Sequence, residues 1–133
     1  MPISRIFVVH QSYTRVGYTD HQEIVFRRHA RAFEDAIAAC AQTTDYPAQA
    51  HFRWTSDASG SLRYWLAEAP EESVQAWTEL ADAGRVEATC LPFHMSALPS
   101  EGTWLRHLGS IRTLRERGFS VSSAMVVGPT GIS

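Results

Sequence analysis

The stretch IFVVHQSYTRVGYTDHQE, residues 6–23, predicts how the chain begins to fold. It opens with a four-residue apolar run rich in β-branched side chains, which is typical of a strand buried on both faces. A polar loop starts at His10, and Asp20 followed three positions later by Glu23 is the pattern of a capping box that opens a helix. Strand, polar loop and helix make the first half of a βαβ unit, in which the loop after the strand is the usual place for binding and chemistry.

The rest of the chain continues this alternation of strands and helices. Residues 22–43 have the spacing of an amphipathic helix, with an apolar stripe made of Phe26, Ala30, Phe33, Ile37 and Cys40. Further strands are expected at residues 50–55, 85–91 and 119–127, and further helices at residues 62–66, 70–83 and 100–117. This order predicts one α/β domain over residues 1–133, with a four-stranded parallel βαβαβαβ sheet.

Composition and charge narrow the classes of partner. The 133 residues are 44% hydrophobic and 20% charged, with a net charge of −2 and no run of like charges, so neither nucleic acid nor an anionic membrane is expected as a partner. No apolar stretch approaches the roughly 20 residues that span a bilayer, and no signal-peptide pattern opens the chain. Two cysteines do not make a disulfide framework, which together with the other features favours a cytoplasmic protein.

Several motifs resemble one enzyme family. VGYTD at residues 16–20, RWT at 53–55, LPFHM at 91–95 and GIS at 131–133 are similar to segments of the catalytic domain of family 38 glycoside hydrolases, the retaining α-mannosidases and their bacterial relatives. The resemblance covers nearly the whole chain, which equals the first half of that family's seven-stranded barrel domain. It implies that the four-stranded sheet is half of a (β/α)7 barrel, with the site at the carboxyl ends of the strands.

The family's metal ligands are not retained at the matching positions. Its first zinc-ligand pair, His and Asp, falls on Tyr13 and Arg15, and its nucleophilic Asp falls on or near Gly128. The fourth ligand, a His, would lie beyond Ser133. The resemblance therefore implies a fold and the position of a site, and it does not imply the zinc-dependent mannosidase reaction.

Polar side chains at the expected carboxyl ends of the strands are the candidate site residues. His10, Asp57 and His94 fall on three such loops and could meet in one pocket, where a histidine with a carboxylate partner can act as an acid or base near neutral pH. Arg15 could hold an anionic group through a two-pronged contact. The candidate ligand-binding residues are Tyr13, Arg15, Tyr18, Trp54 and Cys90.

Each of these residues also has a purely structural interpretation. His10 and His94 could be hydrogen-bonded histidines at strand ends, and Asp57 a turn or cap residue in a serine-rich loop. Trp54 could belong to the core or stack on a flat ligand. The histidines at helical positions, His21, His29 and His107, are not expected to be ligands. Zinc could use His10, Cys90 and His94, but their spacing matches no established metal motif, so no metal or other cofactor is predicted.

Three functional hypotheses follow from the sequence. The first is a metal-independent pocket protein that binds a small polar or carbohydrate-like molecule and, if it is an enzyme, uses acid/base chemistry. The second is a non-catalytic interaction module, and the third is a fragment of a larger mannosidase-like enzyme. Because four strands leave two open sheet edges, the sequence also predicts a homodimer.

Overall fold

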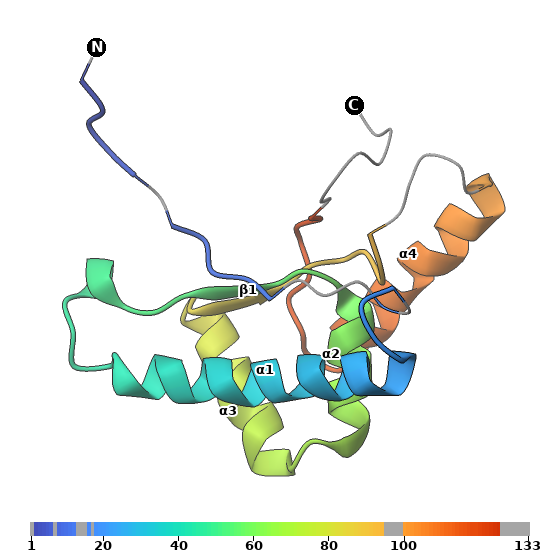
Figure 1. Ribbon diagram of the computed structural model, residues 1–133, viewed down its shortest axis with the longest axis horizontal. Coiled ribbons are helices and arrows are strands. Elements are labelled where there is room, and N and C mark those ends of the chain that lie inside the picture. The colour runs from blue at the N-terminus through green and yellow to red at the C-terminus, as the bar shows by residue number, and fades with distance from the viewer. Residues whose placement is uncertain (1, 7, 13–15, 17, 95–99, 126–133) are drawn as a thin grey trace.

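Four α-helices, a short 3-10 helix and two short strands make up the regular structure of the described residues. The computed structural model describes residues 2–6, 8–12, 16, 18–94 and 100–125. Within them, α1 spans Gln22–Gln42, β1 Trp54–Ser56, α2 Ser59–Glu68, α3 Glu71–Asp82, β2 Val86–Ala88 and α4 Glu101–Glu116. A 3-10 helix, Ala48–Ala50, leads from α1 toward β1 (Figure 1).

The sheet is a two-stranded parallel ladder, so the predicted four-stranded βαβαβαβ sheet and half-barrel are wrong. β1 pairs with β2 in the register Trp54↔Val86, Thr55↔Glu87 and Ser56↔Ala88. The first expected strand contributes a single parallel bridge, His10↔Trp54. The expected fourth strand has no ladder in its described part, residues 119–125, although Cys90 N donates to Ser123 O at 2.7 Å.

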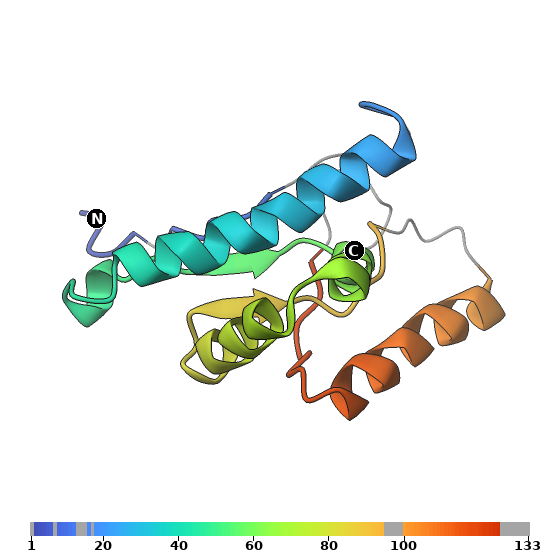
Figure 2. The same ribbon diagram turned by 90° about the horizontal axis from the view of Figure 1, so that it is seen from below.

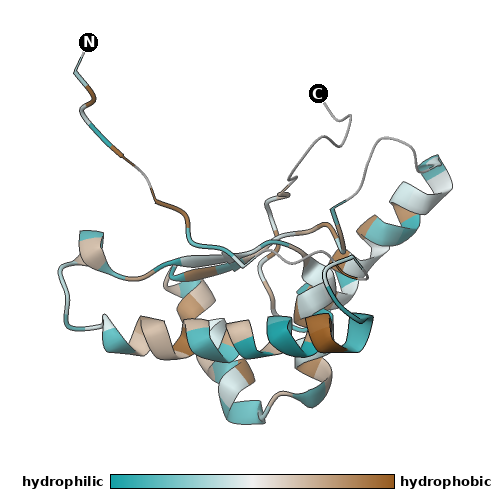
Figure 3. Cartoon of the chain, viewed as in Figure 1, coloured by the Kyte–Doolittle hydropathy of each residue, from teal (hydrophilic) through white to brown (hydrophobic). Residues whose placement is uncertain are grey.

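The β1–β2 ladder is short because helices cover only one of its faces in the described part of the chain. Figure 1 shows α1 and α3 on one side of β1, with the N-terminal segment on the other side. A parallel sheet is stable when helices bury both of its faces. Here Ile6, Val8 and Val9 stay 78%, 70% and 65% exposed, and the apolar colour of this segment lies away from the helices in Figure 3. Among the described residues, no layer therefore covers the expected buried strand.

α1 lies where the sequence predicts it, with a slightly different buried face. Phe33 and Cys40 are buried as expected, but the other buried positions are Val25, His29 and Ala36, while Phe26 and Ile37 are half-buried. The predicted capping box does not form. The N-cap is His21, and the Asp20 carboxylate instead accepts from His21 N and Arg28 Nη2, both at 2.8 Å.

An aromatic cluster joins α1 to three other elements. The Phe33 ring lies 5.1 Å from Trp54 of β1, 5.1 Å from Trp65 of α2 and 4.9 Å from Trp77 of α3, measured between ring centroids. Each such pair contributes about 0.5–1.5 kcal/mol beyond the burial of its area. Because all four rings are buried, this cluster is the centre of the core.

Arg85 is a buried cation that holds the end of α1 against the sheet. Its guanidinium donates to Cys40 O at 3.0 Å, Thr43 Oγ1 at 2.8 Å and Phe52 O at 2.9 Å. The residue before it, Gly84, ends α3 with φ +66°, a conformation that glycine adopts without strain. The charge of Arg85 is thus compensated by backbone and hydroxyl oxygens.

The buried residue of α4 lies at its C-terminal end. Ser100 caps the helix, its Oγ accepting from Thr103 N, and Gly118 follows its end with φ +86°. Leu114 is buried, but Leu105 and Leu108 are 62% and 40% exposed. Figure 2 shows α1 and α4 at opposite sides of the molecule, so α1 does not cover the first turns of α4.

Truncation of Phe33 should destabilise the fold strongly. We expect Phe33→Ala to lower the free energy of unfolding by about 3–5 kcal/mol, because it removes the ring shared by three tryptophans. The matched control is Phe26→Ala on the same helix, which removes a half-buried ring stacked on Tyr64 alone. Urea unfolding followed by tryptophan fluorescence measures both, and equal losses for the two variants would contradict this assignment of the core.

Candidate functional site

The candidate site lies where β1 and β2 end and α2 begins. Asp57 follows β1 directly, is 3% exposed, and its carbonyl accepts from Thr89 Oγ1, beyond β2, at 2.8 Å. The segment after β2 is fixed to the first turn of α2, because Ser59 N donates to Leu91 O at 2.9 Å and Gly60 N to Pro92 O at 3.0 Å. These bonds bring the two predicted exit loops together.

Asp57 and His94 form the central pair of the site. His94 Nε2 lies 3.3 Å from Asp57 Oδ2, and the side chains are 15% and 4% exposed respectively. An ionised carboxylate only accepts hydrogen bonds, so Nε2 carries the proton in this contact and Nδ1 is the accepting nitrogen of the neutral ring. A carboxylate that fixes the tautomer of a histidine in this way is the arrangement found in general-base pairs.

A second histidine, His29, lies on the buried face of α1 beside this pair. It is 4% exposed, and its Nδ1 lies 2.7 Å from Ser61 Oγ of α2. Its Nε2 is buried and has no hydrogen-bond partner among the residues that the structure describes. The sequence interpretation set His29 aside as a helical histidine. The available signal was its spacing, because it stands four residues after Val25 and four before Phe33 on the stripe that is buried.

The environment changes the acidity of Asp57. Burial removes the carboxylate from water and raises the pKa of Asp57 above the ordinary value of 3.8. The charge of a protonated His29, the hydrogen bond from His94 and that from the Ala58 amide act in the opposite direction without cancelling the effect. The Asp57 carboxylate is therefore poorly hydrated, and its ionised form is stabilised mainly by His29 and His94.

The structure does not bring His10 to this pair. His10 pairs with Trp54 at the start of β1, whereas Asp57 follows the end of that strand, and three residues of strand span about 10 Å. The His10 ring instead packs 4.9 Å from Phe52, and its Nδ1 lies 3.1 Å from Arg53 O. Of the three predicted catalytic residues, Asp57 and His94 are in contact and His10 is elsewhere.

The predicted ligand-binding residues are also dispersed. Trp54 is 6% exposed within the aromatic cluster, so its ring has no free face for a ligand, and Tyr18 is 82% exposed. Cys90 is half-buried, and its carbonyl accepts from Ser59 Oγ at 3.2 Å. Tyr13 and Arg15 lie outside the described residues, as does Gly128. Within the described ranges, no three His, Cys, Asp or Glu side chains gather as a metal site requires.

Comparisons with protein-family models, with curated proteins and with solved structures found no match to this chain. The resemblance to family 38 glycoside hydrolases therefore stays a prediction from the sequence motifs. The site has to be interpreted from its own geometry.

A side chain at position 60 should disturb the site. A Cβ on Gly60 would lie 2.5 Å from Pro92 O and 3.1 Å from a ring carbon of Phe93. We expect Gly60→Ala to displace the loop that carries His94 and to destabilise the protein by about 1–3 kcal/mol.

Gly109 is the matched control, because a Cβ there meets nothing within 4 Å in the middle of α4. Gly109→Ala should stabilise by about 0.5–1 kcal/mol, since alanine loses less backbone freedom in a helix. Thermal unfolding and the NMR signals of the His94 ring measure both variants. An unmoved His94 signal in Gly60→Ala would contradict the close packing of the two loops.

Burial of Asp57 should make stability fall as the pH rises. The pKa is higher in the folded than in the unfolded state, so the folded protein retains the proton longer, and the cost of ionisation develops from about pH 3.8 upward. Each pH unit between the two pKa values costs about 1.4 kcal/mol. Asp57→Asn cannot ionise, so its stability relative to the parent should increase with pH over this window.

The control for this pH dependence is Asp35→Asn on the exposed side of α1. Urea unfolding from pH 3 to pH 7 compares the three proteins. If Asp57→Asn and the parent differ by the same amount at every pH, the Asp57 carboxylate is not buried as the structure has it.

Proposed function

We propose that this protein binds a small polar or carbohydrate-like molecule at the carboxyl ends of β1 and β2, and that the Asp57–His94 pair exchanges a proton with it. The observation that carries the proposal is the 3.3 Å contact between His94 Nε2 and Asp57 Oδ2 at the joined exit loops of two parallel strands. The proposed chemistry uses only groups of the chain itself.

The two members of the pair have different roles. His94 is the more exposed member and is the proton acceptor of this proposal through Nδ1, which is buried among the described residues, so a ligand has to displace the side chains around it. Asp57 holds the ring in this tautomer and stabilises the imidazolium that forms when the proton is taken up. His29, buried on α1, is a positioning residue whose interaction with Asp57 favours the ionised carboxylate.

A second candidate function is a non-catalytic interaction module. Three exposed apolar side chains of the N-terminal segment favour it: Ile3 at 83%, Ile6 at 78% and Val8 at 70% exposure. Such side chains are typical of surfaces that meet a partner. The predicted homodimer stays a prediction, because the structure describes one chain. Across the described residues, no helix is long and apolar enough to cross a bilayer.

Proton transfer by His94 can be tested without knowing the natural ligand. The probe is 5-nitrobenzisoxazole, whose ring opens when a base removes one proton. We expect the protein to accelerate this reaction, and His94→Gln to lower the acceleration about 100-fold, the usual scale of a positioned general base. Asp57→Asn should lower it less, because the ring stays but its tautomer is no longer held. A neutral monosaccharide that binds the site should inhibit competitively.

His21→Gln is the matched control, since His21 is exposed at the start of α1 and its side chain makes no cap hydrogen bond. It should leave the rate unchanged. A parent protein no faster than buffer, or equal rates in His94→Gln and His21→Gln, would reject the proton-transfer function and leave the interaction module as the better account.

A further inference from the structure

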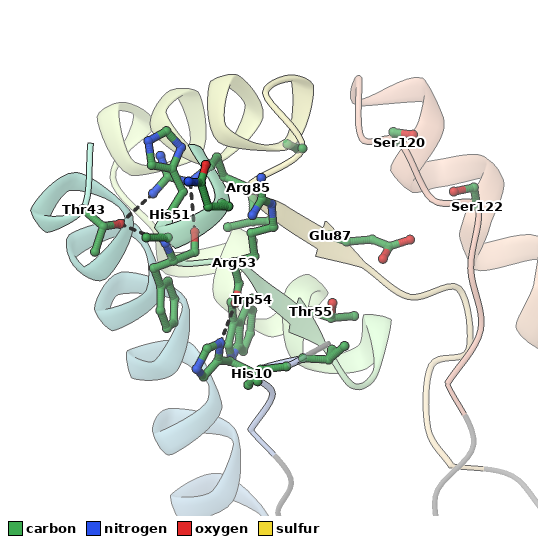
Figure 4. Close-up of a pocket in the computed structure, with 18 of the residues that line it drawn as sticks. His10, Thr43, His51, Arg53, Trp54, Thr55, Arg85, Glu87, Ser120 and Ser122 are labelled. Atoms are coloured by element: carbon green, nitrogen blue, oxygen red, sulfur yellow. Dashed lines mark hydrogen bonds between the residues drawn. The ribbon is translucent and has the colours of Figure 1, made fainter. Parts of the chain in front are cut away.

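A groove of about 920 Å³ runs beside β1 and β2, and Thr43 at the end of α1 and Ala81 of α3 also line it. Its walls are the N-terminal segment with Ile6, Val8, Val9 and His10 and the C-terminal segment with Ser120 and Ser122, and its floor includes Thr55 and Glu87 (Figure 4). The volume is in the range of small-molecule sites. Asp57 and His94 are not among its lining residues, so the groove is separate from the proton-transfer pair.

Four polar side chains, those of Thr55, Glu87, Ser120 and Ser122, line this groove. Thr55 and Glu87 are opposite each other in the ladder, and both point away from the buried face that holds Trp54 and Val86. Across the groove, Ser120 and Ser122 are exposed and alternate with the buried Phe119 and Val121. Figure 4 shows Glu87 extending toward these two serines.

These four side chains form no polar interaction that holds the described part of the fold together. Considering the described residues alone, Thr55, Glu87, Ser120 and Ser122 make no side-chain hydrogen bond or ion pair. Glu87 is nevertheless half-buried on the floor of the groove. A carboxylate accepts hydrogen bonds only, and the hydroxyls around it can accept as well as donate. The cluster is therefore suited to a positively charged hydrogen-bond donor.

The two arginines of the groove do not neutralise Glu87. Arg85 donates to three oxygens at the α1 side, and Arg53 Nη2 donates to Ala48 O at 3.3 Å. Figure 4 shows the Arg85 guanidinium near Thr43, while Glu87 points to the other end. Among the described residues, the Glu87 carboxylate thus has no protein partner, whereas the guanidinium groups of Arg85 and Arg53 already donate to protein oxygens.

The N-terminal wall supplies an apolar surface and one more acceptor. His10 Nδ1 faces the carbonyl of Arg53 and must donate to it, which leaves Nε2 as an acceptor in the neutral ring. Val8 and Val9 line the same groove and are 70% and 65% exposed. A ligand with an apolar part would cover these side chains and remove their area from water.

We propose that this groove binds a small organic ammonium ion, a primary amine with an apolar substituent. The ammonium group has three N–H donors, so it donates to the Glu87 carboxylate and to two of the hydroxyls of Thr55, Ser120 and Ser122 in charge-assisted hydrogen bonds. The apolar substituent lies along the N-terminal wall. This inference does not depend on the proton-transfer function, because the two sites share no residue.

Phenethylammonium is the probe, and 2-phenylethanol is its uncharged counterpart. In ¹H–¹⁵N NMR titrations of the whole chain, phenethylammonium should shift the amide signals of Thr55, Glu87, Ser120 and Ser122 in a saturable manner. Binding of 2-phenylethanol should be at least tenfold weaker, since it cannot pair with the carboxylate. Glu87→Gln should weaken phenethylammonium binding at least tenfold, and Glu87→Asp should restore part of it.

Glu68→Gln is the matched control, because Glu68 is exposed at the end of α2 and does not line the groove. The dispersion of the NMR spectrum shows that each variant is folded, and if Glu87→Gln is not, the comparison of amine with alcohol on the parent decides. Equal binding of the two probes, no saturable shift, or equal affinities in Glu87→Gln and Glu68→Gln would overturn the proposal.

Discussion

The packing of Phe33 against three tryptophans is the interaction on which the other features depend. One ring on α1 contacts a strand residue and two helix residues, so the position of α1 sets the positions of β1, α2 and α3 together. The same packing buries Glu34 partly, where its carboxylate accepts from Trp65 Nε1 at 2.7 Å and Ser73 Oγ at 2.9 Å. Aromatic burial and a satisfied carboxylate thus fix one helix layer on one face of the ladder.

This layer determines the environment of the candidate site. His29 is one helical turn from Phe33, so the packing that buries Phe33 also buries His29 against Ser61 of α2. α2 in turn begins two residues after Asp57, and its first turn holds the loop that carries His94. The elevated pKa of Asp57 is therefore a consequence of core packing, which excludes water from the carboxylate.

The sequence predicted the helices better than the sheet, for physical reasons. Helices are indicated by local signals: the 3.6-residue period of α1, the Ser100 cap, and the glycines after α3 and α4. The hydrogen bonds behind these signals join residues that are close in the sequence. A run such as residues 6–9 indicates a buried strand only if layers exist to cover it, and that depends on the whole chain. Asp57 and His94 were predictable as a pair because both follow neighbouring parallel strands. The sequence could not exclude His10 from this pair, because the pairing of His10 with Trp54 joins residues far apart in the sequence.

The one-sided helix layer also explains why the two proposed sites differ chemically. Along β1, Trp54 and Ser56 face the helices and are buried, whereas Thr55 faces the open side. Polar groups beyond the strand end, such as Asp57, are enclosed by α1 and α2 and must find partners inside the protein. Polar groups on the open side, such as Glu87, are hydrated and need no partner for folding. The enclosed groups are thereby suited to proton transfer, and the open ones remain available to an external ligand.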